Sequence, residues 1–286
     1  VVPSGLERRI DARTLELQRK VYAAINGLGS TVVDFFSYIG GLALLLGQVN
    51  RWLIRAMLRQ VRFGNTALFQ QLVRVGKRSV PIISRVSACI GMILVLQMAP
   101  PLEDYGAKAS IANINAVAVL RELGPLISAI VLTGFAGAAI AAELGTMVVG
   151  EEIEALEAMA LNPIRFLVVP RVTATMLGLI FLAVFADIVA IVAGGVMGVL
   201  LLDIPVGIYK ANTLDQAQLS DFLTGIFKAG VFGFLIGIIA CYNGLKVSGG
   251  AAGVGRATTK TVVDSIVSII FADLTFTALF FALGWN

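Results

Sequence analysis

The chain has 286 residues, of which 58% are hydrophobic and only 14% are charged. Soluble globular domains carry about 25% charged residues, so this composition is typical of an integral membrane protein. The chain has no histidine, which excludes His-based metal sites and Ser-His or Cys-His catalysis, and its two cysteines, Cys89 and Cys241, lie in apolar windows and predict no disulfide framework.

The N-terminal part, residues 1–65, is predicted to form cytoplasmic and interfacial helices. Residues 6–21 have the pattern of an amphipathic helix. Within residues 30–63, four arginines recur every three or four positions opposite Trp52 and several aliphatic residues; they are Arg51, Arg55, Arg59 and Arg62. Such a basic stripe favours a helix lying in the headgroup plane. The alternative is a sixth spanning helix over residues 31–49, with the arginines at its inner end.

The remainder, residues 66–286, is predicted to be a permease-like domain of about five spanning helices. A spanning helix needs roughly 20 apolar residues, and irregular backbone cannot face lipid. Five windows qualify: 80–101, 112–148, 166–202, 220–245 and 261–284. The second and third are long enough to be tilted, kinked or partly outside the hydrocarbon. The fold class is therefore all-α and membrane-integral.

The distribution of basic residues predicts the orientation. Residues 1–85 hold 13 of the 22 lysines and arginines and only four acidic residues, so the positive-inside rule places this end in the cytoplasm. Counting spans puts residues 150–165 and 246–260 inside, and the C-terminus outside. The net charge of +4 then follows from topology, and we expect no nucleic-acid binding.

Small residues recur at a spacing of four in the second window, for example at Gly137, Ala141 and Gly145. Further glycines follow in the later windows, among them Gly233 and Gly237. This pattern lets helix backbones approach closely and predicts tight packing between spans.

A short acidic segment, residues 150–163, lies between the second and third windows. It has four glutamates in seven residues, Glu151, Glu152, Glu154 and Glu157, and ends at Pro163. As a helix it would present Ile153, Leu156 and Met159 on one face. Its place at a membrane surface suggests a docking element for a soluble partner. The alternative is a solvated loop helix.

Several ionisable residues lie within the apolar windows, where charges are costly and often functional. Arg121 lies about 29 residues before the acidic segment, over about 40 Å of helix, which places Arg121 and Glu122 near the outer boundary. Lys228 lies about 27 Å from the inner Lys246, at a comparable outer depth. These three residues could hold an anionic headgroup. The alternative is that they pair or snorkel only for stability.

Residues 250–257, GAAGVGRA, share the glycine skeleton of a phosphate-binding loop. They have Arg256 and Ala257 where that loop requires Lys and Ser or Thr, and they follow an apolar window instead of a strand. We therefore expect no nucleotide site, no catalytic residue, no metal and no cofactor on this chain.

Four motifs in fixed order identify a family resemblance: LRELGP at 120–125, AAELG at 141–145, EEIEALEAMALNP at 151–163 and GRATTKTVV at 255–263. Together they resemble the MlaE-type permeases, the membrane subunits of MCE lipid ABC transporters. The resemblance runs from about Val73 to the end of the chain.

The resemblance implies a homodimer in the bacterial inner membrane, with an interfacial helix, five spans and a cytoplasmic N-terminus. Two cytoplasmic ATPase subunits would bind ATP and Mg, an MCE protein would sit on the outer side, and a small cytoplasmic accessory protein would complete the assembly. Phospholipid, or a related lipid, would be moved between the membrane and the MCE channel.

The resemblance also implies roles for individual residues. The coupling helix near 150–162 would dock the ATPase through Glu151, Glu152, Ile153, Glu154, Leu156, Glu157, Met159 and Leu161. The lipid pocket would be lined by Leu94, Gln97, Leu102, Tyr105, Arg121, Glu122 and Lys228, and Asp273 matches a family acid. Two features depart from the family: Phe135 stands where many members have arginine, and the outer loop carries Pro100 and Pro101.

Two other function classes are compatible with the residues. A proton-coupled secondary transporter would use Glu122, Asp264 or Asp273 as carriers, although no inverted repeat is visible. A non-transporting scaffold would anchor a soluble complex through the acidic segment. The sequence leaves open the direction of transport, the identity of the lipid and of the partners, and the effect of Phe135.

Overall fold

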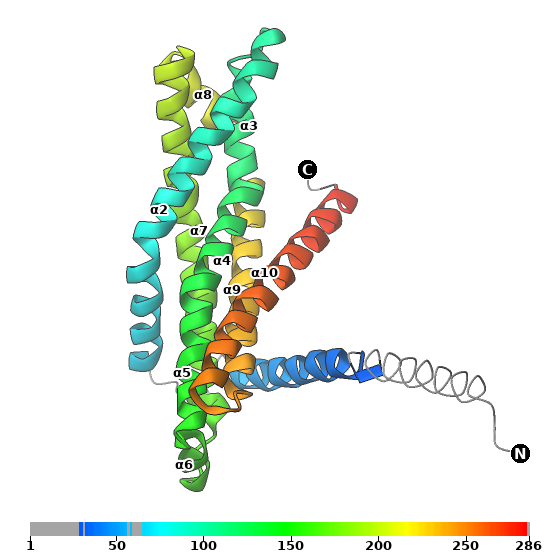
Figure 1. The fold of residues 1–286 in the computed structure, drawn as a ribbon. Coiled ribbons are helices and arrows are strands. Elements are labelled where there is room, and N and C mark those ends of the chain that lie inside the picture. Colours follow the sequence, from blue (N-terminus) through cyan, green and yellow to red (C-terminus); the bar gives the residue numbers. More distant parts are fainter. Residues whose placement is uncertain (1–28, 31, 56–57, 59–64, 285–286) are drawn as a thin grey trace, which may run out of the picture. The chain divides into compact units, whose positions relative to one another are not determined.

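The computed structural model describes residues 29–30, 32–55, 58 and 65–284 (Figure 1). All regular elements in these ranges are helices, which confirms the predicted all-α class. Six of the described helices are long and apolar enough to cross a membrane. The chain is therefore a multi-pass membrane protein. It divides into two compact units, Val1–Gly47 and Gln48–Asn286.

The first of the six helices is Val32–Arg55, 24 residues long. Large apolar side chains along it are exposed, including Val33, Phe36 and Leu44. Near its end, the Arg55 guanidinium lies 5.2 Å from the centre of the Trp52 ring, a cation–π contact within one helical turn. Its length allows a sixth span, and its basic end also suits the interface, so both predictions remain. Residues 6–21, and Arg59 and Arg62, lie outside the described residues.

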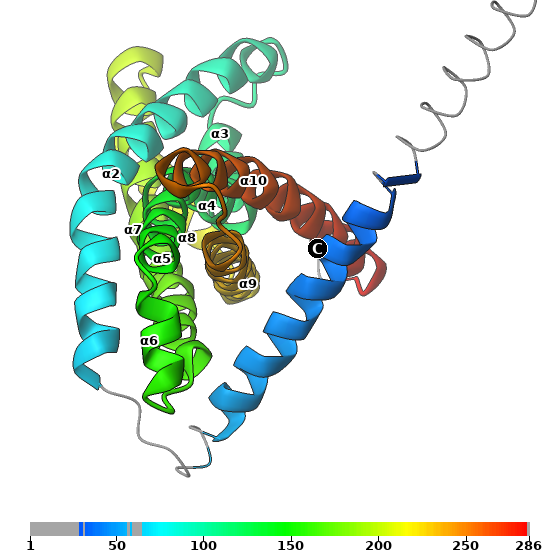
Figure 2. The same cartoon turned by 60° about the horizontal axis from the view of Figure 1, so that its bottom comes forward.

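The second unit is a helical bundle (Figures 1 and 2). Its first complete helix, α2 (Asn65–Asp104), continues through Pro81, Pro100 and Pro101. The second window forms one continuous helical path made of α3 (Ser110–Ala118), η1 (Val119–Leu123), α4 (Gly124–Leu132), η2 (Thr133–Gly137) and α5 (Ala138–Val149). Segments η1 and η2 are π-helical, each adding one wide turn, and such turns occur often at functional sites.

The later helices complete the bundle. After the short helix α6 (Glu152–Ala158) and the π-helical η3 (Ile164–Val168) come α7 (Val169–Leu202), α8 (Val206–Gln216), α9 (Leu219–Leu245) and α10 (Gly250–Ala282). The apolar windows at 166–202, 220–245 and 261–284 thus correspond to α7, α9 and α10. Helix α8 lies in a connection for which the sequence predicted no helix.

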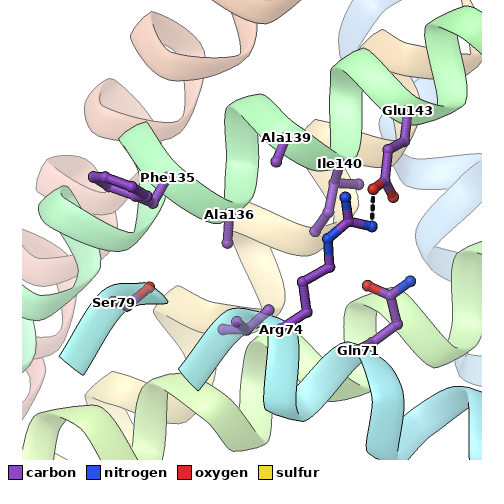
Figure 3. Close-up of a pocket in the computed structure, with 9 residues that line it drawn as sticks. Gln71, Arg74, Ser79, Phe135, Ala136, Ala139, Ile140 and Glu143 are labelled. Carbon is purple, nitrogen blue, oxygen red and sulfur yellow. Dashed lines mark ion pairs between the residues drawn. The ribbon is translucent and has the colours of Figure 1, made fainter. Parts of the chain in front are cut away.

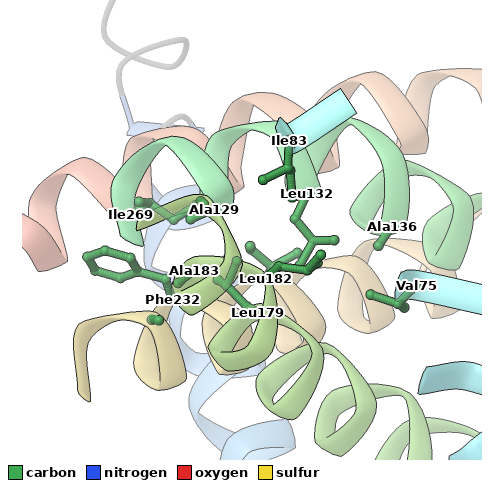
Figure 4. Packing of buried hydrophobic residues seen from close by; sticks show 13 residues of the cluster. Val75, Ile83, Ala129, Leu132, Ala136, Leu179, Leu182, Ala183, Phe232 and Ile269 are labelled. Atoms are coloured by element: carbon green, nitrogen blue, oxygen red, sulfur yellow. The ribbon is translucent and has the colours of Figure 1, made fainter. Parts of the chain in front are cut away.

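The core lies where α7 packs between α2 and α9. Figure 4 shows its buried side chains, among them Ile83 of α2, Leu179 of α7 and Phe232 of α9. Glycines permit the close approach of α9 to α7: a Cβ on Gly233 would lie 2.7 Å from the carbonyl oxygen of Thr175, and one on Gly237 would lie 2.9 Å from the Cα of Val172. The tight packing predicted from small residues is confirmed at these contacts.

One glycine on α2 leads to a prediction about the thermal stability of the protein. A Cβ on Gly91 would lie 2.0 Å from the carbonyl oxygen of Ala190 in α7, so Gly91→Ala forces two helix backbones apart. Overpacking of this kind costs about 1–3 kcal/mol. We expect a lower midpoint of thermal unfolding in detergent. Gly76→Ala on the same helix is the matched control, since nothing lies within 4 Å of the added Cβ; an equal loss in both variants would contradict the packing described.

At the end of the bundle that carries α8, a second apolar cluster forms around Val95, Ile111 and Tyr209. The Tyr209 ring packs over Gly195 and Gly198 of α7. Its hydroxyl oxygen accepts a hydrogen bond of 3.1 Å from Nδ2 of Asn115 in α3. Helix α8 is thereby fixed to α3 and α7.

Candidate functional site

The most unusual side chain in the bundle is Lys228 of α9, which is 1% exposed. Its Nζ donates hydrogen bonds to Glu122 Oε2 at 2.6 Å, to Asp273 Oδ1 at 2.9 Å and to Thr277 Oγ1 at 2.9 Å. Thr277 Oγ1 in turn donates to Glu122 Oε1 at 3.0 Å. All three ammonium hydrogens therefore have acceptors, as a buried cation requires. We call Glu122, Lys228, Asp273 and Thr277 the lysine cluster.

Three helical segments bring these residues together. Glu122 lies in the π-helical η1, Lys228 in α9, and Asp273 and Thr277 one turn apart on the same face of α10. The approach of α9 to η1 depends on Gly225, because a Cβ there would lie 2.1 Å from the carbonyl oxygen of Leu120. Lys228, three residues further along α9, then faces Glu122.

A second ion pair lies beside the lysine cluster. Arg121 Nε is 3.6 Å from Asp221 Oδ1, near the start of α9. Lys228, Glu122, Arg121 and Thr224 line one small cavity of about 70 Å³, which Thr277, Phe280 and Phe281 of α10 complete. The cavity is large enough for a few atoms of a polar group.

An apolar hollow of about 790 Å³ adjoins this cavity and shares Thr224 and Phe280 with it. Its other walls are mainly apolar and come from α9 and α10; they include Leu223, Phe227, Phe276 and Leu279. The rings of Phe227 and Phe276 meet edge to face, with centroids 5.4 Å apart. The arrangement thus combines a charged, hydrogen-bonding cavity with an apolar hollow, which suits an amphiphile.

The structure places the predicted pocket residues in two groups. Arg121, Glu122 and Lys228 meet at one cavity, as their estimated depths predicted. Leu94, Gln97, Leu102 and Tyr105 belong to the end of α2 and the turn after it, and they line neither this cavity nor the adjoining hollow. Leu102 packs on the cluster around Val95, and Tyr105 is 85% exposed. Their role in a pocket stays a prediction.

Sequence reasoning missed part of the site. Asp221, Thr224, Thr277 and Phe280 were not named, and Asp273 was named only as a family acid and as a possible proton carrier. The available signal was the spacing of Asp273 and Thr277, two polar residues four positions apart and so on one face of the predicted helix. In the described part of the chain, no three His, Cys, Asp or Glu side chains gather as they would around a metal ion.

Helix α6 lies at the end of the bundle opposite α8 (Figure 1). It is short and carries no buried residue. It is flanked by two residues with left-handed backbone conformation, Glu151 before it (φ 58°) and Ala160 after it (φ 58°). Ile153 and Leu156 are half-buried, whereas Met159 is 62% exposed. All four predicted glutamates are exposed.

Asn162 Oδ1 accepts hydrogen bonds from the backbone N–H groups of Ile164 and Arg165 and caps the helical path that leads into α7.

Comparison with known proteins agrees with the motifs. A model of the family Permease MlaE matches residues 68–279. The chain belongs to the MlaE permease family. Its relatives include a probable ABC transporter permease protein of Rickettsia felis, 35% identical over 90% of this chain and 97% of the relative. Another is the intermembrane phospholipid transport system permease protein MlaE of Haemophilus influenzae, 32% identical over 91% of this chain and 98% of the relative.

A plant relative extends the range of the family. The chloroplastic protein TRIGALACTOSYLDIACYLGLYCEROL 1 of Arabidopsis thaliana is 34% identical over 83% of this chain and 67% of its own length. As an MlaE permease, the chain is a membrane permease of the ABC transporter class. The match covers α2 to α10, and so includes the lysine cluster and α6.

Proposed function

We propose that this MlaE permease is the membrane subunit of an ABC transporter that moves phospholipid, or a related lipid, between the inner membrane and an MCE-protein channel. The observation that carries the proposal is the lysine cluster beside an apolar hollow of about 790 Å³. The printed name of the Haemophilus influenzae relative, which describes intermembrane phospholipid transport, supports the same lipid class.

The two halves of the site would bind the two parts of a lipid. The apolar walls of α9 and α10 would take acyl chains and keep them out of water, where each exposed CH₂ would cost about 0.8 kcal/mol. The headgroup would lie at the cavity that Arg121 and the lysine cluster line; Arg121 would supply positive charge there, whereas the Lys228 ammonium is shared by two carboxylates. Passing the chains from the bilayer to the hollow is nearly neutral, because lipid tails are as apolar as aliphatic side chains, so moving the lipid out of the membrane is the step that needs energy.

That energy would come from a separate ATPase. ATP and Mg would bind to the ATPase and no cofactor to this chain, which would be a non-catalytic subunit. Helix α6 is exposed and carries an apolar face bordered by glutamates, as expected of a helix that sits in a groove of a soluble partner. Closure of two ATPase subunits, transmitted through α6, would compress the hollow and expel the lipid.

The assembly would be a homodimer of this chain with two ATPases and an MCE protein on the outer side. A small cytoplasmic accessory protein would complete it. The chain would lie in the bacterial inner membrane with its N-terminus in the cytoplasm, so that α6 faces the cytoplasm and the lysine cluster lies toward the outer leaflet.

The test is purification of the protein from its native membrane in mild detergent, followed by mass spectrometry of the proteins and lipids that accompany it. We expect an ATPase subunit, an MCE protein and bound phospholipid. A homodimer without ATPase would contradict the proposal and favour a proton-coupled secondary transporter. Soluble partners without any bound lipid would favour a scaffold.

A further inference from the structure

A second pocket lies nearer the α6 end of the bundle, between α2 and the helical path η2–α5 (Figure 3). It has a volume of about 50 Å³, several times the room that one water needs. Arg74 and Ser79 line it from α2, and Phe135, Ala139 and Glu143 line it from the facing side. None of these residues belongs to the lysine cluster.

The charges at this pocket do not balance. Arg74 forms an ion pair with Glu143, and Arg171 Nη2 of α7 lies 3.4 Å from the other oxygen of the same carboxylate. Two guanidinium groups thus share one carboxylate, which leaves one positive charge in excess. Arg74 is half exposed. Arg74 lines the pocket and Arg171 does not, so Arg74 is the group that offers charge and donors to an anion there.

A buried hydroxyl points to a ligand in the same pocket. Ser79 is 1% exposed, and its Oγ has no hydrogen-bond partner. Leaving such a group unpaired costs about 1–3 kcal/mol, so a partner that fills the pocket is expected. The other lining side chains near Ser79 are apolar, namely Val75, Ala136 and Phe135.

The polar and apolar groups are ordered along the bundle. Ser79 lies five residues beyond Arg74 on α2, about 7.5 Å further from the α6 end. Phe135, 43% exposed, lies eight residues before Glu143, about 12 Å deeper by the same rise. Ser79 is also the first residue of the apolar stretch Ser79–Asp104. Charge, hydroxyl and aromatic ring therefore follow one another into the membrane.

We propose that this pocket binds a phospholipid of the leaflet on the α6 side. Its phosphate would lie at Arg74, its ester carbonyl would accept a hydrogen bond from Ser79 Oγ, and its acyl chains would leave past Phe135. The order of phosphate, ester and chain in a phospholipid matches the order of these groups. The site is separate from the lysine cluster, and the proposal does not depend on how transport is driven.

The test uses the full-length protein in nanodiscs made with a photoactivatable phospholipid whose reactive group is near the ester, followed by mapping of labelled peptides. We expect label on the peptides that contain Ser79 and Ala139. Arg74→Gln should lower this label about tenfold, the value of one charge-assisted hydrogen bond. Ala139→Leu should abolish it by filling the pocket without changing any charge.

Lys77→Gln is the matched control, because Lys77 is an exposed cation on the same helix that does not line the pocket. It should keep the label at the wild-type level. Equal labelling of wild type, Arg74→Gln and Ala139→Leu would overturn the proposal. So would full protection of the wild type by inorganic phosphate, since the pocket would then bind free phosphate instead of lipid. Size-exclusion profiles identify any variant that fails to fold.

Discussion

A variant in which Ile153, Leu156 and Met159 are all replaced by glutamate should lose ATP-dependent lipid movement while the permease itself stays folded. The reason is that α6 has no buried residue, so these side chains add little to the core of the bundle, and in the proposed assembly they would contact the ATPase. Placing an unpaired carboxylate in an apolar groove costs about 3 kcal/mol or more, which lowers the affinity for the ATPase about a hundredfold.

The measurements are co-purification of the ATPase and lipid transfer by the reconstituted complex. The conservative variant Ile153→Val with Leu156→Met is the control, since it keeps the face apolar and should keep both signals. Unfolding midpoints of all variants should agree closely. Normal ATPase binding and normal lipid transfer in the glutamate variant would contradict the proposed coupling role of α6.

Replacement of Lys228 by methionine should destabilise the protein and abolish lipid transfer. The substitution leaves Glu122 and Asp273 facing each other without the cation that holds both. Removing one partner of a buried ionic group costs about 3–5 kcal/mol. Thermal unfolding in detergent measures the loss, and Lys210→Met, at an exposed lysine of α8, provides the control.

A neutral variant separates structure from function at the same site. Combining Lys228→Met with Glu122→Gln and Asp273→Asn removes all three charges, so most of the lost stability should return. If the charges bind the headgroup, lipid transfer should stay low in this stable variant. Wild-type transfer by the neutral variant would show that the lysine cluster serves only stability.

The sequence predicts the helical architecture well because each spanning helix has its own hydrophobic signal. Windows of about 20 apolar residues mark α7 and α9 within a few residues and the C-terminal end of α10, which begins at Gly250, well before its window. Boundaries at the polar ends were missed: α2 begins at Asn65 and runs through two consecutive prolines, and α8 was not anticipated. Such ends are set by packing, as Tyr209 against Gly195 and Gly198 illustrates, and packing has no local sequence signal.

For the site, the sequence predicts only how deep each residue lies along its own helix. Counting the rise per residue places Glu122 and Lys228 at one level, and in the structure Lys228 Nζ lies 2.6 Å from Glu122 Oε2. Depth does not tell which helices are neighbours, so the pairing of Arg121 with Asp221, and the contribution of Thr277, could not be derived. The π-helical turn at η1, which holds Arg121 and Glu122, likewise was not predicted from the sequence.

The most direct test of the proposed function is lipid transfer by the purified complex of this chain with its ATPase in liposomes that contain a fluorescent phospholipid. Transfer out of the liposomes should require hydrolysable ATP, should stop with a non-hydrolysable analogue, and should fall to background with Lys228→Met. Transfer that proceeds without ATP and follows an imposed proton gradient would contradict an ATP-driven permease.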